Sequence, residues 1–175
     1  MKRVLQPYFD INSETPNINM VIGESNSGKT SLLIEIACGY ISHNKNVVFV
    51  TTEDTLTEIY LLFKKPLGES NVNNLLQTGQ LVIMSTSTTP DWDSNEECEG
   101  YYIFIDSITA YENLDSLVAM KQISGKSVWF SKQQIKNNSK SEDLRLADSS
   151  WHNKRINSIL SIENTTSSYN ITKVK

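Results

Sequence analysis

The most constraining feature of the chain is the segment GESNSGKT, which fits the pattern G-x-x-x-x-G-K-T from Gly23 to Thr30. A mostly apolar run precedes it at 18–22, and apolar residues at helical spacing follow it over 32–40. This context predicts a strand, a glycine-rich turn and a helix in direct succession. The motif therefore indicates a fold that binds phosphate groups at this turn.

Each residue type in the segment has a chemical reason. Glycines let the loop curl so that backbone N–H groups point at phosphate oxygens, and the following helix adds its N-terminal N–H groups and positive dipole. Lys29 is predicted to place its charge on the β- and γ-phosphates, and the Thr30 hydroxyl to bind Mg²⁺. A plain Gly/Ser turn with an incidental lysine is the alternative. The predicted nucleotide contacts are Gly23, Glu24, Ser25, Asn26, Ser27, Gly28, Lys29, Thr30 and Ser31.

Length and composition predict a single domain over residues 1–175. The chain is 38% hydrophobic and 21% charged, as is ordinary for a globular protein. No stretch approaches the roughly 18 apolar residues of a membrane span, so we expect no membrane contact. There is no C-x-x-C pattern, Cys38 is expected in the core, and a cytoplasmic location is predicted.

Charge is distributed unevenly along the chain. Residues 1–119 hold 6 Lys/Arg and 16 Asp/Glu (6 − 16 = −10), whereas residues 120–175 hold 10 and 4 (10 − 4 = +6), which together give the net charge of −4. A basic final third on an acidic body indicates a polyanion partner that approaches from one side. A solvated basic face is the alternative.

Strands and helices are predicted to alternate. Strands are expected at 18–22, 47–50, 81–84, 101–107 and 127–130, with a closing pair at 158–162 and 169–174. Helices are expected from the phosphate loop to about 42, and at 55–65, 72–77 and 112–124, with a helical turn at 151–157 and a possible edge strand at 2–5. The polar stretches 85–100 and 135–150 are expected to be loops. This alternation predicts an α/β fold of three layers, a mostly parallel central sheet with helices on both faces.

Parallel sheets bind ligands at the carboxyl ends of their strands. The phosphate loop, Glu53, Asp106 and Gln133 all follow or end predicted strands, so we expect them at one edge of the sheet. Asp106 closes an apolar run and is predicted to hold Mg²⁺ through water, opposite Thr30. An aspartate that caps the next helix is the alternative.

The order of four segments resembles the RecA-like ATPase core. These are GESNSGKT, VVFVTTE, YYIFIDS and VWFSKQQIK, and they span nearly the whole chain. That core is shared by RecA/RadA-type recombinases, DnaB-type helicases, KaiC-like proteins and phage packaging motors. The resemblance implies ATP and Mg²⁺ as cofactors, Glu53 as the residue that activates the attacking water, and Gln133 as a sensor of the γ-phosphate. Asp54 and Gln134 are the respective alternatives.

The same resemblance implies partners. A nucleic-acid loop would carry Lys136, Lys140 and Arg145, and Trp151 or His152 could stack on a base. Lys173 and Lys175 would reach the ATP site of a neighbouring subunit, with Arg155 as another candidate. A homo-oligomer, ring or filament, with ATP at subunit interfaces is therefore expected.

The leading hypothesis is an oligomeric ATPase that acts on single-stranded DNA or RNA in phage-type recombination, unwinding or genome packaging. A small-molecule phosphotransferase, such as a nucleoside kinase, and a KaiC-like ATP-dependent regulatory module are the alternatives. A GTPase is disfavoured because no N-K-x-D motif is present. The sequence leaves open DNA against RNA and ring against filament.

Overall fold

The computed structural model describes residues 10–86, 98–107, 114–133, 156–164 and 169–174. The possible edge strand at 2–5, most of the loop predicted at 85–100 and the whole loop predicted at 135–150 lie outside the described residues.

Seven strands form one sheet in the order β3-β2-β4-β5-β1-β6-β7. Neighbouring strands are parallel, except that β6 and β7 form an antiparallel pair at one edge. The strands are β1 (Ile18–Gly23), β2 (Val47–Thr51), β3 (Leu81–Ser85), β4 (Tyr102–Asp106), β5 (Val128–Gln133), β6 (Ser158–Asn164) and β7 (Tyr169–Lys173).

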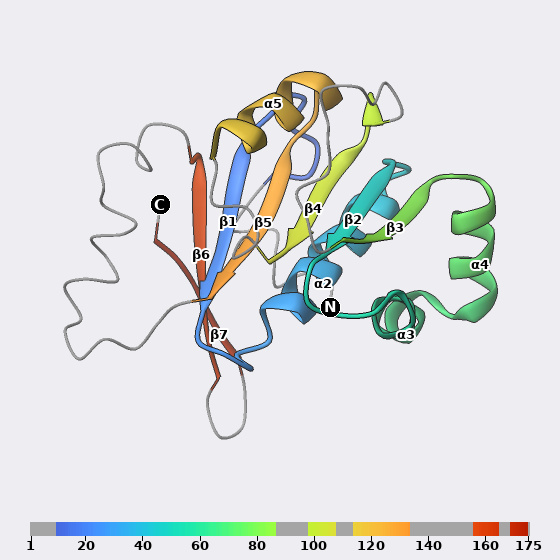
Figure 1. Ribbon diagram of the computed structural model, residues 1–175, viewed down its shortest axis with the longest axis horizontal. Helices are drawn as coiled ribbons and strands as arrows, with labels where there is room; N and C mark the ends of the chain where they lie inside the picture. Colours follow the sequence, from blue (N-terminus) through green and yellow to red (C-terminus); the bar gives the residue numbers. More distant parts are fainter. Residues whose placement is uncertain (1–9, 87–97, 108–113, 134–155, 165–168, 175) are drawn as a thin grey trace.

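Helices cover both faces of this sheet. Helices α2 (Lys29–Ile41), α3 (Leu56–Leu67) and α4 (Glu69–Gln77) pack on one face, and α5 (Leu114–Ser124) packs on the other (Figure 1). Successive strand residues serve the two cores in turn, as a strand covered on both sides requires. The prediction of a three-layer α/β fold with a mostly parallel sheet is confirmed.

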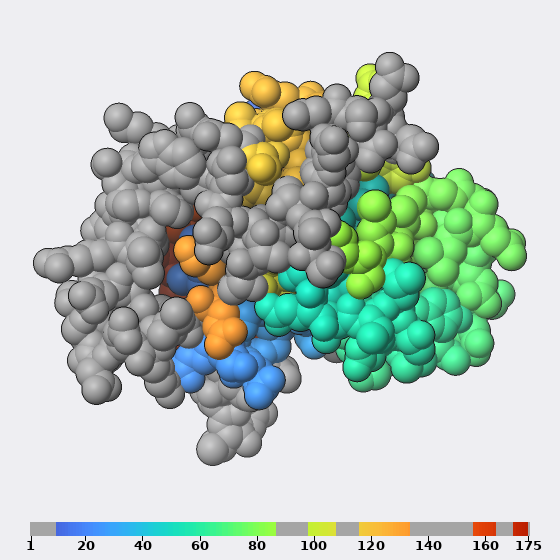
Figure 2. All heavy atoms as spheres, in the orientation of Figure 1, coloured from blue at the N-terminus to red at the C-terminus, as the bar shows by residue number. Residues whose placement is uncertain are grey.

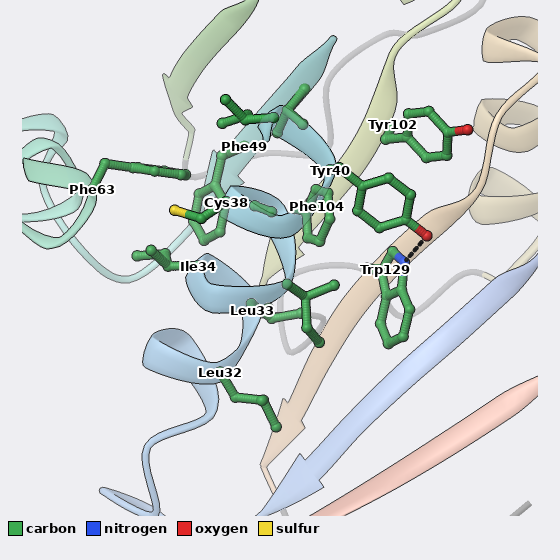
Figure 3. Packing of buried hydrophobic residues seen from close by; sticks show 14 of the residues in the cluster. Leu32, Leu33, Ile34, Cys38, Tyr40, Phe49, Phe63, Tyr102, Phe104 and Trp129 are labelled. Atoms are coloured by element: carbon green, nitrogen blue, oxygen red, sulfur yellow. Dashed lines mark hydrogen bonds between the residues drawn. The ribbon is translucent and has the colours of Figure 1, made fainter. Parts of the chain in front are cut away.

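A row of aromatic rings fixes the alignment of the central strands. Phe49 of β2, Phe104 of β4 and Trp129 of β5 lie directly opposite one another. Neighbouring ring centroids are 6.3 and 6.4 Å apart, with interplanar angles of 9° and 5°. Helix α2 places Tyr40 against this row, where its hydroxyl accepts a hydrogen bond from Trp129 Nε1 at 3.4 Å (Figure 3). Because a slip of one residue would turn each ring to the opposite face, the row holds the strands in register.

Some element bounds differ from those predicted. Helix α3 continues through Pro66, where the sequence had predicted its end. A proline there loses a backbone hydrogen bond and crowds the preceding turn, but its fixed φ is helical. The helix continues to Leu67, and Gly68, whose φ is +81°, follows as its C-cap. Helix α4 then begins at 69 instead of 72. Strand β5 continues to Gln133 because its pairing with β1 does not stop at 130.

The predicted helical turn at 151–157 is wrong for its described end. Asn157 donates its backbone N–H to the Ile18 carbonyl at 2.7 Å, and its side-chain oxygen accepts from the Ile18 N–H at 2.9 Å. These bonds begin the pairing of β6 with β1 instead of a helix. The expectation that Cys38 is a core residue is confirmed. Among the described residues, no helix is long and apolar enough to cross a membrane.

The chain turns from β2 into α3 through a capped helix start. Thr55 Oγ1 accepts a hydrogen bond from the Glu58 N–H at 3.3 Å, and Glu58 Oε2 accepts one from the Thr55 N–H at 2.8 Å. This reciprocal pair satisfies two of the backbone donors that a helix N-terminus leaves unpaired.

Thr55→Ala should therefore lower the free energy of unfolding by about 1 kcal/mol, because it removes the side-chain acceptor of the cap. Urea denaturation measures the loss. Thr57→Ala is the matched control, an exposed threonine in the first turn of the same helix, and should change stability by less than about 0.5 kcal/mol. Equal losses for the two variants would contradict the role of the cap.

Candidate nucleotide-binding site

Gly23 ends β1 at a position where no side chain fits. A Cβ atom there would collide with Ser27 Oγ and lie 2.7 Å from the Ile162 carbonyl oxygen on β6. Ser27 is itself buried, and its hydroxyl has no hydrogen-bond partner among the described residues. The start of the loop is thus packed tightly against β6 and Ser27, while residues 24–26 are exposed.

The turn uses backbone conformations that few residues tolerate. Asn26 and Gly28 have φ of 58° and 93°, in the left-handed region where Gly and Asn cost least. The Ser27 N–H donates to the Glu24 carbonyl at 3.2 Å. Helix α2 then starts at Lys29 without a side-chain cap, so no capping side chain competes for its first backbone N–H groups, which can bind a ligand at the helix N-terminus.

Lys29 folds its ammonium group back over this loop. Its Nζ donates to the Glu24 carbonyl oxygen at 2.7 Å. Desolvation lowers the pKa of Lys29, and the negative charges of Asp106 and Glu53 oppose that shift. The ammonium group is therefore bonded to the loop and lies in the field of two carboxylates, Asp106 at the end of β4 and Glu53 just after β2.

Asp106 is the most buried of these carboxylates, at 4% exposure. It accepts a hydrogen bond from the hydroxyl of Ser131. Burial raises the pKa of Asp106, whereas the hydroxyls of Ser131 and Thr30 and the charge of Lys29 lower it. The first turn of α2 and the end of β4 thus meet at this carboxylate.

The aromatic row explains why these groups meet. Asp106 lies two residues beyond Phe104 and therefore on the same face of the sheet. Ser131 lies two residues beyond Trp129 in the same way. Strand β5 lies between β1 and β4 in the sheet. Register fixed within the core therefore also fixes the level of the polar groups at the carboxyl edge.

Glu53 lies at the same edge. Its Oε1 accepts a hydrogen bond from Ser107 Oγ at 2.5 Å, and the Ser107 N–H donates to Thr52 Oγ1 at 3.1 Å. The N-cap of α3 is Thr55, so helix capping does not account for the position of Glu53. Asp54, the alternative candidate, is half-buried and donates its N–H to the side chain of the preceding Thr51 at 2.9 Å.

Gln133 ends β5 directly opposite Gly23 and, by alternation, shares a face with Ser131. It lies beside the start of the phosphate loop, and Figure 2 shows the orange end of β5 at the surface next to the blue loop and helix start. Lys173 is exposed on β7 opposite Leu160, which pairs in turn with Val21. It therefore lies on the same row across the sheet as Val21 and Ser131, two strands beyond β1.

The remaining predicted site residues lie outside the described part of the chain. They are Lys136, Lys140, Arg145 and Lys175, together with the alternatives Gln134, Trp151, His152 and Arg155.

The arrangement fits a nucleoside triphosphate with Mg²⁺. The loop leaves no room for a side chain at Gly23, so its backbone can approach a ligand closely, and Lys29 supplies a cation over the loop. Thr30 and Asp106 supply a hydroxyl and a carboxylate, the hard oxygen donors that Mg²⁺ prefers. Two such donors leave most of the octahedral ligand sphere to phosphate oxygens and water.

Two serines of this network were not predicted from the sequence. Ser131 interrupts the apolar run of β5, and Ser107 follows Asp106 directly. Both are buried hydroxyls at the end of a buried strand, and such polar interruptions are the signal that could have marked them.

Comparison with known proteins gives the fold. No protein-family model matches the chain, and no curated protein matches it in sequence. Among solved structures it is similar to the crystal structure of the flagellar accessory protein FlaH from Methanocaldococcus jannaschii, with a TM-score of 0.71 and 18% sequence identity over 98% of this chain and 83% of that chain. The chain has a RecA-like fold. The predicted RecA-like architecture is thereby confirmed, whereas a specific recombinase, helicase or packaging family is not supported at this level of identity.

Gly23→Ala should destabilise the protein by about 1–3 kcal/mol, because the added methyl group forces a shift of the loop or of β6. It should also weaken nucleotide binding, since the loop N–H groups would move. Gly39→Ala, within α2, is the matched control. The added Cβ would meet only the flexible tip of Ile11, at 3.1 Å. The Gly39→Ala variant should therefore keep a stability and a nucleotide affinity near those of the unmodified chain. Denaturation and nucleotide titration test this, and unaltered binding by Gly23→Ala would contradict the close approach of the loop.

Proposed function

We propose that the chain binds and hydrolyses ATP with Mg²⁺, and that the bound nucleotide controls its association with further copies or with a protein partner, as in a KaiC-like regulatory module. The observation that carries the proposal is the meeting of Thr30 and Asp106 beside Lys29 at the carboxyl edge of the sheet. A phosphate loop that was only a structural turn would not require a buried acid from another strand at its helix.

The residues at this edge suit the steps of phosphoryl transfer. The loop N–H groups and Lys29 would bind the phosphates, and Glu53 would orient the attacking water. Ser107 holds one oxygen of Glu53 and so favours one orientation of that carboxylate. When bound, Mg²⁺ held by Thr30 and, through water, by Asp106 would neutralise charge on the phosphate oxygens.

The regulatory form of the proposal is supported by the comparison. FlaH, which shares the fold, is described as a flagellar accessory protein. Such a description refers to a protein that accompanies an assembly. We therefore place the consequence of ATP binding in assembly.

A motor on single-stranded nucleic acid is the second candidate. The charge distribution favours it, because residues 120–175 carry 10 Lys/Arg against 4 Asp/Glu. Lys136, Lys140 and Arg145 would then contact phosphates, and Lys173 and Lys175 would act in a neighbouring ATP site. Hydrolysis stimulated by single-stranded DNA or RNA would be its signature.

Glu53→Gln should separate binding from turnover. It removes the charge that orients water but keeps the size of the side chain, so hydrolysis should fall by about 100-fold or more while ATP still binds. If ATP promotes assembly, the variant should remain assembled in ATP, whereas the unmodified protein should disassemble as ATP is consumed. Light scattering and phosphate release, measured on the same sample, report the two properties.

Two further variants and the addition of single-stranded nucleic acid complete this experiment. Lys29→Ala should neither assemble nor hydrolyse, and Asp54→Asn should retain turnover. Full turnover by Glu53→Gln, with loss in Asp54→Asn, would transfer the role to Asp54. A mass that is independent of ATP, together with hydrolysis stimulated by single strands, would replace the regulatory proposal by the motor.

A further inference from the structure

Ser131 places a polar hydroxyl group in an otherwise apolar stretch of the core. It lies on the central strand β5, it has 0% exposure, and the three residues before it in the strand are Val128, Trp129 and Phe130. Burial of a hydroxyl group without a hydrogen bond costs roughly 1–3 kcal/mol. The hydroxyl of Ser131 is accommodated because it donates to Asp106 Oδ1.

The position of Ser131 in the sheet is between the phosphate loop and Asp106. It pairs with Val21 on β1, and its neighbour Phe130 pairs with Ile105 on β4. Asp106 thus receives a hydrogen bond from Ser131 within the sheet, while the Thr30 hydroxyl at the start of α2 lies close enough to lower its pKa.

The two hydroxyls differ in what they can reach. Thr30 is half-buried at the start of α2, and a hydroxyl can donate one hydrogen bond while its lone pairs bind a cation. Ser131 is enclosed in the core and has no access to a ligand on the loop. Its effect on a bound group can only pass through Asp106.

We infer that Ser131 is a positioning residue, which fixes the orientation of the Asp106 carboxylate so that this carboxylate can hold the water shell of the magnesium ion of a bound nucleotide. The inference rests on the proposed function in one respect only, that Mg²⁺–nucleotide binds at this loop. Groups that orient metal ligands typically change metal affinity by about 10- to 100-fold when they are removed.

A purely structural serine would behave differently. Its loss would lower stability, but it would not change how strongly nucleotide binding depends on magnesium. The ratio of nucleotide affinity in Mg²⁺ to that in EDTA therefore distinguishes the two roles, because it reports the contribution of the metal and needs no catalytic turnover.

The test is titration of a fluorescent ATP analogue, in Mg²⁺ and in EDTA, on four proteins. Ser131→Ala should reduce the ratio by about 10-fold or more and leave the affinity in EDTA unchanged. Ser131→Thr keeps the hydroxyl and should restore most of the ratio. Ser127→Ala is the matched control, a buried serine just before β5 that accepts from the Asn17 N–H at 3.0 Å, and should leave the ratio as in the unmodified chain.

Each outcome has one meaning. A ratio for Ser131→Ala equal to that of the unmodified protein overturns the inference and leaves the proposed function standing. An unmodified protein that binds no nucleotide, or binds it equally with and without Mg²⁺, overturns the proposed function and the inference together. If Ser131→Ala does not fold, Ser131→Cys carries the test, since it keeps the volume with a weak donor and should also lower the ratio.

Discussion

The approach of the Thr30 hydroxyl to the Asp106 carboxylate, which lowers the pKa of that carboxyl against the effect of its burial, is the contact on which the candidate site depends. It joins the start of α2 to the end of β4, two elements separated by 76 positions (106 − 30) in the sequence. Strand β1, which leads into the phosphate loop and α2, is not a neighbour of β4 in the sheet, because β5 lies between them. The contact therefore requires three strands to end at the same level, and it requires α2 to pack on the face to which Asp106 points.

The core satisfies both requirements at once. The row formed by Phe49, Phe104 and Trp129 aligns β2, β4 and β5, and Tyr40 attaches α2 to that row (Figure 3). The parallel pairing of β1 with β5 then brings the start of the phosphate loop to the same level. Aromatic pairs of this kind add about 0.5–1.5 kcal/mol each beyond the burial of their area. Packing energy in the interior is thus what places polar groups at the edge, where each of them pays a cost of desolvation.

The sequence predicts the elements of this structure better than their connections. The phosphate loop, the buried strands and the capped start of α3 follow from local patterns of glycine, apolar runs and Thr55 with Glu58. The bonds from Ser131 to Asp106 and from Ser107 to Glu53 cross 25 and 54 positions, and no local pattern determines them. They depend on strand order, which alternation of helices and strands restricts but does not specify. The continuation of α3 through Pro66 was missed because proline, which has no N–H to donate and crowds the carbonyl four residues earlier, ordinarily ends a helix.

The RecA-like fold positions the candidate nucleotide site, but the fold alone does not determine what a bound nucleotide would control. We propose that Thr30 and Asp106 act as one unit on magnesium. A double-mutant cycle of Thr30→Val and Asp106→Asn, with the Mg²⁺-dependent part of ATP binding as the readout, is the sharpest test. Each single variant should lose most of that part, and the double variant should lose little more. Losses that simply add, or single variants that keep the full magnesium dependence, would contradict it.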